Sequence, residues 1–274
     1  MDITLFQFGL IIVGGFLAGV MNTLAGYGSM ISLSLLMDVI GLPPNVANGT
    51  NRVNVLAQCS ASSYSYHKNG KLDLKSSKWI IISMVLGAIL GVVTVLHVSN
   101  EQFKEIFKYL IIIMFFMIIL KPKRWMREVS EESEFPFSVR VLAFFALGFY
   151  GGFIQMGMGV FFLVCMVFLE RNTLIRANGI KVTIVAIYTV VVLAIFQYQG
   201  LVNWKAGLLI AIGQSLGGYL TAKYASQSPN ANKWAYYVLL VIVIAVITYK
   251  IGIEAGLTAA SIASAAYYAS LKED

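Results

Sequence analysis

Charged side chains are scarce in this sequence. Asp, Glu, Lys and Arg make up only 12% of the 274 residues, whereas hydrophobic residues make up 58% and the mean hydropathy is +0.78. A typical soluble domain has about 25% charged residues, so this chain has too little charge to cover the surface of one. Long apolar runs recur from end to end, which predicts an all-α, polytopic transmembrane helical protein.

Cysteine is also scarce. Cys59 and Cys165 both lie in apolar segments, with no partner motif and no ligand spacing, which argues against a disulfide framework or a zinc site. We therefore expect no metal and no cofactor. The net charge is +7, but most Lys and Arg residues flank apolar segments, as membrane orientation requires. We expect a lipid bilayer around the protein and no nucleic acid as a partner.

The apolar runs divide the chain into about ten hydrophobic segments. Two of these have only about ten residues, well below the about 20 that a spanning helix needs, so we expect short or broken helices at the Gly-rich breaks before them. The segments lie at about residues 6–21, 30–40 (short), 46–66, 79–96, 103–120, 139–155, 160–169 (short), 174–198, 204–224 and 233–249.

Two motifs occur twice in the chain. Ala47-Asn48-Gly49-Thr50-Asn51-Arg52 is matched 130 positions later by Ala177-Asn178-Gly179-Ile180-Lys181, and Gly26-Tyr27-Gly28 is matched by Gly157-Met158-Gly159. Landmarks at nearly one offset indicate a duplicated unit. If each unit crosses the membrane five times, this odd number places the second unit upside down. If the short pieces do not cross, the two repeats are parallel.

The basic residues favour the inverted arrangement. With the amino terminus outside, most of them lie on the cytoplasmic side, as the positive-inside tendency expects, and parallel repeats give a weaker bias. We therefore predict two inverted-topology repeats in the inner (plasma) membrane, with both termini extracytoplasmic. The predicted parts are a first transmembrane repeat at 1–120, a charged cytoplasmic linker at 121–138, a second repeat at 139–254 and a tail of unknown role at 255–274.

Two cations, Arg52 and Lys181, lie well inside predicted segments. An unpaired cation at that depth is energetically costly and marks a functional site by default. Asp38 and Glu170 lie at the ends of the short segments. Either the two cations reach these carboxylates and form structural ion pairs, or their counter-ion is a transported anion. Their matching positions in the two repeats favour the transported anion.

The glycine-rich breaks supply a second element of an anion site. A half-helix that begins just after either break would point unpaired N–H groups and the positive end of its dipole into the membrane. Glycine would also let an anion approach the backbone closely. One isolated Gly-x-Gly is more often a packing contact between helices. Two copies, each followed by a buried cation, favour a binding site.

The order of these motifs resembles one family. The glycine-rich break, the short apolar piece, Gly41-Leu42-Pro43-Pro44, Ala-x-Gly-Thr-Asn at 47–51 and Gly-x-Leu-Asp at 70–73 are similar to the sulfite exporter TauE/SafE family. The resemblance implies an inner-membrane transporter that exports sulfite, sulfoacetate or a related organosulfonate or oxyanion. By position, the expected lining of the anion site is Gly26, Gly28, Ser29, Asn48, Thr50, Asn51, Arg52, Gly157, Gly159, Asn178 and Lys181.

We therefore expect a small anion to be held between the two repeats and exported by alternating access. Arg52, Lys181, Asn amides and glycine-loop N–H groups would hold it. The second copy has Ile180 where the first has Thr50, so the cavity is only pseudo-symmetric, and how two cations share one ligand is left open.

Two other functions are alternatives. An anion channel would use the same cations but would conduct without saturating. A membrane-embedded enzyme would need a nucleophile paired with a histidine or an acid, and Ser29, Ser32 and Cys59 have no such partner in the sequence, so we expect no enzyme. Whether the chain forms a homodimer is left open.

Overall fold

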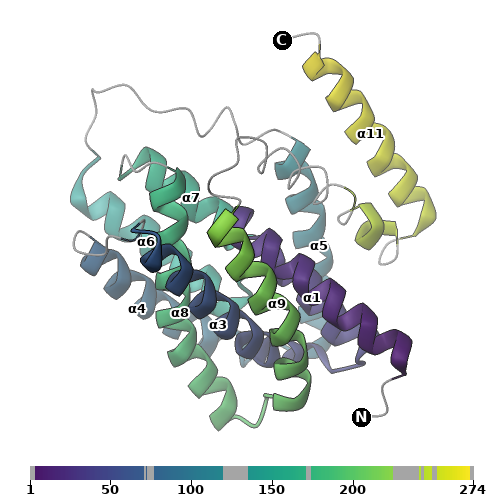
Figure 1. The fold of residues 1–274 in the computed structure, drawn as a ribbon, viewed down its shortest axis with the longest axis horizontal. Coiled ribbons are helices and arrows are strands. Elements are labelled where there is room, and N and C mark those ends of the chain that lie inside the picture. The colour runs from purple at the N-terminus through teal and green to yellow at the C-terminus, as the bar shows by residue number, and fades with distance from the viewer. Residues whose placement is uncertain are drawn as a thin grey trace.

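The computed structural model describes residues 4–70, 72, 77–119, 135–170, 174–224, 241, 244–248 and 252–271. Within these ranges the chain is helical and contains no strand, as predicted (Figure 1). The elements are α1 (Leu5–Ala25), α2 (Gly28–Ser34), the π-helix η1 (Leu35–Val39), α3 (Pro44–Lys68), α4 (Lys78–Val95), α5 (Asn100–Ile119), α6 (Phe137–Phe153), α7 (Met158–Phe168), α8 (Leu174–Tyr198), α9 (Trp204–Tyr224) and α11 (Ile253–Leu271).

Several of these helices have the length and composition of membrane spans. Among the described residues, α1, α4 and the part of α8 at Arg176–Tyr198 are long and apolar enough to cross a bilayer. Shorter apolar helices cover Gly28–Val39, Phe137–Phe153 and Met158–Phe168, and two of these are the predicted short segments. Large apolar side chains are exposed on the outer surface at one-turn intervals along α4, as a lipid-facing stripe would be, at Ile82, Leu86 and Leu90.

The observed bounds follow the predicted segments closely. The segments 174–198 and 204–224 coincide with α8 and α9. The first helix runs to Ala25 rather than ending at residue 21, because the Asn22 amide donates a hydrogen bond to Gln58 and so does not interrupt the helix. Most of the predicted linker at 121–138 and most of the segment 233–249 lie outside the described residues.

Glycines in left-handed conformations make both breaks. Gly26 ends α1 with a φ of 78°, and its N–H donates to the carbonyls of Met21 and Asn22. Gly157 precedes α7 with a φ of 72°. This region of backbone conformation is open to glycine without strain, so the glycine pairs in the sequence correctly predicted where the helices break.

The helices of the two halves of the chain are interleaved. α1 packs along α9 and α4 packs along α6, and α3 packs against both α8 and α9. Figure 1 shows α1, α3 and α9 side by side. Glycines let the backbones touch at these crossings, since a Cβ on Gly19 would lie 2.0 Å from the Gln214 carbonyl oxygen and one on Gly87 would lie 2.1 Å from that of Phe145.

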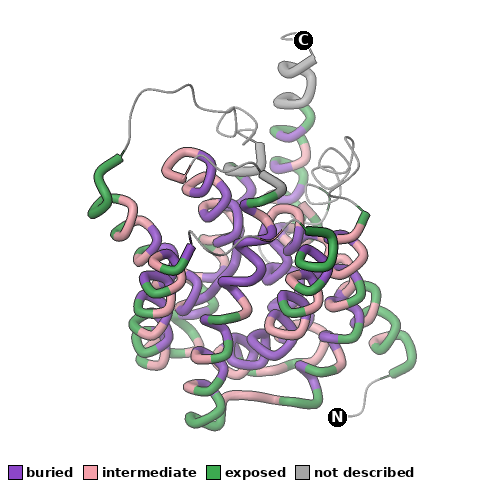
Figure 2. Tube along the Cα trace, turned by 60° about the vertical axis from the view of Figure 1, so that its left-hand side comes forward, coloured by how far each residue is buried: buried purple, intermediate pink, exposed green. Residues whose placement is uncertain are grey.

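The interior of the bundle is where the polar motifs of the sequence lie. Figure 2 shows buried residues gathered through the middle of the bundle and exposed residues around its outside. α11, which belongs to the tail of unknown role, stands to one side of the other helices in Figure 1. The site therefore has to be sought where α3 and α8 meet the two helix breaks.

Candidate functional site

α3 is a polar helix enclosed by other helices. Asn48, Thr50, Asn51 and Arg52 are all 0% exposed. The helix is long enough to span a bilayer, but it packs on α8 and α9 instead of facing the outside. Buried polar side chains need hydrogen-bond partners, so the partners of these residues define what the site can do.

The Arg52 guanidinium binds the carboxyl-terminal end of α6. Its Nη1 donates to the carbonyl of Gly151 at 2.7 Å and to Gln155 Oε1 at 2.6 Å. Its Nη2 donates to the carbonyl of Gly152 at 3.0 Å and to Asn48 Oδ1 at 3.1 Å. The last carbonyls of a helix lack partners within the helix and carry the negative end of its dipole, so a buried cation is stabilised there.

The Lys181 ammonium binds the end of α1 in the same way. Its Nζ donates to the carbonyls of Asn22 at 3.2 Å and Thr23 at 3.1 Å, and to Asn178 Oδ1 at 2.7 Å. The arrangement is reciprocal: the cation of α3 binds the first helix of the second half, and the cation of α8 binds the first helix of the first half. Each cation also contacts the asparagine of its own repeated motif.

The contacts of the two cations differ from the structural ion pairs considered from the sequence. Their described hydrogen-bond acceptors are backbone carbonyls and side-chain amides. Glu170, one of the two expected carboxylate partners, pairs with Arg140, whose Nη1 lies 3.1 Å from its Oε1. Sequence reasoning missed this solution because helix ends supply negative charge that no residue type reveals.

At the two breaks, the space beside the glycines is filled by backbone. A Cβ on Gly26 would lie 2.3 Å from the Cα of Gly159, and one on Gly159 would lie 2.4 Å from the Cα of Gly26. Gly28 packs equally closely on the carbonyl of Ala18. In this conformation the two breaks therefore touch each other directly. Gly157 has a similar contact with the side chain of Met114.

Three other predicted site residues lie around α2 and α3. Thr50 Oγ1 accepts a hydrogen bond from the Asn203 N–H at 2.9 Å, which ties α3 to the start of α9. Asn51 Oδ1 accepts one from Ser32 Oγ at 2.6 Å, which ties α3 to α2. Ser29 is buried, and its hydroxyl has no partner among the described residues.

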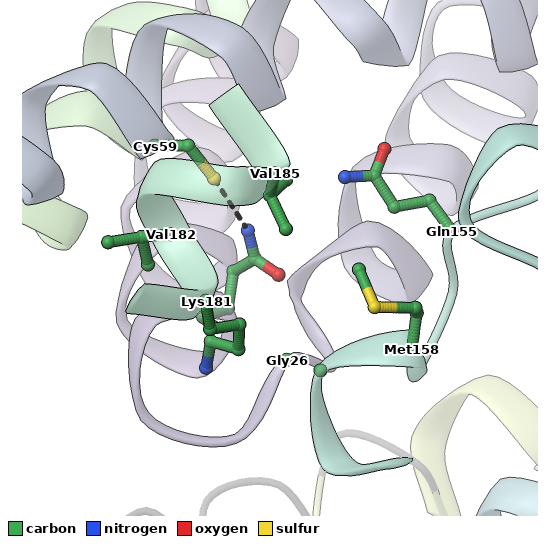
Figure 3. A pocket seen from close by; sticks show the side chains of 9 residues that line it. Gly26, Cys59, Gln155, Met158, Lys181, Val182 and Val185 are labelled. Atoms are coloured by element: carbon green, nitrogen blue, oxygen red, sulfur yellow. Dashed lines mark hydrogen bonds between the residues drawn. The ribbon is translucent and has the colours of Figure 1, made fainter. Parts of the chain in front are cut away.

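A small cavity lies where the two breaks meet α3 and α8. Figure 3 shows Gln155 on one side of it, with Cys59, Val182 and Lys181 on the other. Its volume of about 10 Å³ is near the room that one water molecule needs, so this conformation is closed around the site. The cavity is lined by Asn22, Gly26, Cys59, Gln155, Met158, Gly159, Lys181, Val182 and Val185.

The cavity brings together three predicted residues from both halves, namely Gly26, Gly159 and Lys181. Arg52 and Asn178 do not line the cavity themselves. Each is hydrogen-bonded to a residue that does, Arg52 to Gln155 and Asn178 to Lys181. Asn22 and Gln155 were not predicted. A usable signal was present, because each is an amide residue just before a glycine break in an otherwise apolar segment.

Comparisons with known proteins agree with this architecture. A family model described as "Sulfite exporter TauE/SafE" matches residues 11–247. The "Probable membrane transporter protein ORF9" of Sinorhizobium sp is 29% identical over 82% of this chain and 85% of its own length. A "Probable membrane transporter protein" of Haemophilus influenzae is 28% identical over 81% of this chain and 87% of its own length. YfcA of Escherichia coli K12, also named a probable membrane transporter protein, is 24% identical over 78% of this chain and 79% of its own length. No solved structure matches.

Proposed function

The chain belongs to the sulfite exporter TauE/SafE family, and from that premise we propose that it exports a small sulfur-containing anion by alternating access. The cargo class is sulfite, sulfoacetate or a related organosulfonate or oxyanion. The membrane is the inner (plasma) membrane, the two halves are inverted repeats, and both termini are extracytoplasmic. The anion binds between the halves, close to Arg52, Lys181 and the glycine breaks.

The reciprocal placement of Arg52 and Lys181 is the observation that carries this proposal. Each cation comes from the third helix of one half and binds the end of the first helix of the other half. The same exchange relates α1 with α9 and α4 with α6, because each pair joins the first helix of one half to the fourth helix of the other. Such an exchange is what a two-fold axis between two repeats produces, whether the repeats are inverted or parallel, and the basic residues of the sequence are what favours the inverted arrangement.

The helix-end carbonyls hold both cations in the closed conformation, and an oxyanion can replace them. A carbonyl oxygen carries a partial charge, whereas an oxyanion carries a full one and makes shorter, stronger hydrogen bonds. Relative movement of the two halves would separate each cation from the helix end that it binds. The bound anion would then take over those hydrogen bonds, which links its binding to the opening of the site.

An anion channel has weaker support. A channel needs a continuous water-filled path, whereas Gly26 and Gly159 touch across the site and the cavity beside them has room for about one water molecule. A closed channel would share these features, so the kinetics of anion flux distinguish the two functions.

The proposal is tested by anion flux into vesicles that contain the purified protein. Sulfite, sulfoacetate, sulfate and chloride are compared for wild type, Lys181→Ala and the control Lys205→Ala, which removes an exposed lysine. We expect saturable flux of a sulfur oxyanion that is lost only in Lys181→Ala. Flux that rises linearly with concentration would indicate a channel. Flux unchanged by Lys181→Ala would mean that this cation is structural.

A further inference from the structure

Arg52 and Lys181 lie at different heights along one helix pair. α3 and α8 run antiparallel, because Ser63 of α3 hydrogen-bonds Thr183 of α8 at 2.6 Å while Arg52 lies over the ring of Phe196, 5.7 Å from its centroid. The residue numbers increase along α3 as they decrease along α8. Lys181 is therefore near the end of α3 that is opposite to Arg52.

The separation of the two charged groups follows from their contacts with α3. Arg52 reaches back to Asn48, and Lys181 binds the carbonyl of Asn22, whose side chain is hydrogen-bonded to Gln58. Asn48 and Gln58 are ten residues apart on α3, which is about 15 Å at the rise of a helix. This length is the rise between two backbone positions of α3, and it places the groups that the two cations bind at different levels of the helix. A charge-assisted hydrogen bond is only about 2.8 Å long, so this arrangement favours a separate anion at each cation over one shared anion.

Lys181 lines one cavity, and a different cavity is lined by two residues that contact Arg52. Lys181 lines the cavity at the helix breaks. A second cavity, of about 30 Å³, lies beyond Arg52 on the side of the amino-terminal end of α3. Asn48 and Phe196 form part of its wall, and both contact Arg52. The second cavity is lined by Asn45, Asn48, Val95, Leu96, Val98, Phe103, Phe196 and Leu201.

Arg52 also retains capacity for a ligand. Its Nε is buried and has no hydrogen-bond partner among the described residues. A buried guanidinium donor without a partner is costly, so an anion that bound beside it would be stabilised. Gln155 lies between the two cations, since its Oε1 accepts from Arg52 and its side chain lines the cavity of Lys181. It is held at a φ of 65°, in the left-handed region that favours glycine.

We propose that the anion moves through two binding stations in series, one at Arg52 and Asn48 beside the second cavity and one at Lys181 and Asn178 in the first cavity. Gln155 separates them and satisfies Arg52 when the Arg52 station is empty. This inference rests on the proposed function and refines it, because each half of the chain then supplies the cation and the asparagine of one station. It also explains why the two cations need not share one ligand.

The test uses the same isosteric change at the two equivalent asparagines. In Asn48→Asp the new carboxylate replaces an amide oxygen 3.1 Å from Arg52 Nη2, and in Asn178→Asp it replaces one 2.7 Å from Lys181 Nζ. We expect each carboxylate to pair with its cation and to take the place of the anion there. Asn48→Asp and Asn48→Ala both also lose the hydrogen bond that Asn48 Nδ2 donates to the Phe153 carbonyl at 2.8 Å, so the alanine variant controls for that loss. The matched controls Asn48→Ala and Asn178→Ala remove the same amides without adding charge, and thermal unfolding checks that every variant folds.

Calorimetric titration with sulfite counts the anions bound to detergent-purified protein. We expect wild type to bind two per chain, and each alanine variant also to bind two but with lower affinity at the station that lost its amide. Each aspartate variant should bind one, and the double aspartate variant none. Wild type binding one sulfite that either aspartate variant abolishes would mean a single shared site and overturn the inference. Aspartate variants that all bind as wild type does would also overturn it. Wild type binding none of the sulfur oxyanions would refute the proposed function itself.

Discussion

The contact between the two helix breaks can be tested by adding a single methyl group. Gly26 has a φ of 78°, and a Cβ there would lie 2.3 Å from the Cα of Gly159. Gly41 has almost the same φ, 79°, but a Cβ there would meet nothing within 4 Å. A Cβ on Gly159 would meet Gly26 at 2.4 Å, and Gly159 does not have a positive φ. The three glycines therefore separate conformational strain from crowding.

The expected magnitudes follow from these geometries. Alanine in a left-handed conformation costs roughly 1 to 2 kcal/mol, which is the whole expected effect of Gly41→Ala. Crowding in a packed interior costs about 1 to 3 kcal/mol, which is the expected effect of Gly159→Ala. Gly26→Ala combines both, so it should destabilise the protein by about 2 to 5 kcal/mol.

Thermal unfolding in detergent, followed by tryptophan fluorescence, measures these differences. Each kcal/mol corresponds to a shift of about 2 to 4 °C in Tm for a domain of roughly this size. Gly26→Ala should therefore unfold several degrees below Gly41→Ala. Equal Tm values for these two variants would refute the reasoning, because the breaks would then not touch. The closed site would in that case need another explanation.

Two further predictions concern charged groups, and the same unfolding assay measures both. Burial raises the pKa of Glu170, and the Arg140 guanidinium opposes only part of that rise. The stability that Glu170 contributes to the folded protein should therefore be greatest at low pH and should be lost as the pH rises through the pKa of the folded state. Glu170→Gln should remove this pH dependence, and an unchanged pH profile would contradict the assignment. Arg52→Lys should lower the free energy of unfolding by about 1.5 to 3 kcal/mol for each of the Arg52 hydrogen bonds that an ammonium cannot make. The control Lys205→Arg changes an exposed cation and should leave Tm unchanged.

Much of the helical framework could be read from the sequence. The apolar runs at 174–198 and 204–224 gave the bounds of α8 and α9, and the pairs around Gly26 and Gly157 gave the breaks. These features are local, since a run of apolar residues sets helix length and a glycine permits a left-handed turn. The first helix was underestimated because Asn22 is stabilised by a residue 36 positions away, at Gln58.

The sequence by itself determined that two cations would be buried at matching positions in the two halves. Only the tertiary structure decided what they bind. Arg52 binds the end of α6, about 100 residues away, and Lys181 binds the end of α1, about 158 residues away. These acceptors are backbone carbonyls, which every residue carries, so they become specific only where a helix ends. Their use as partners depends on how the two halves interleave, and no local pattern of residues encodes that packing.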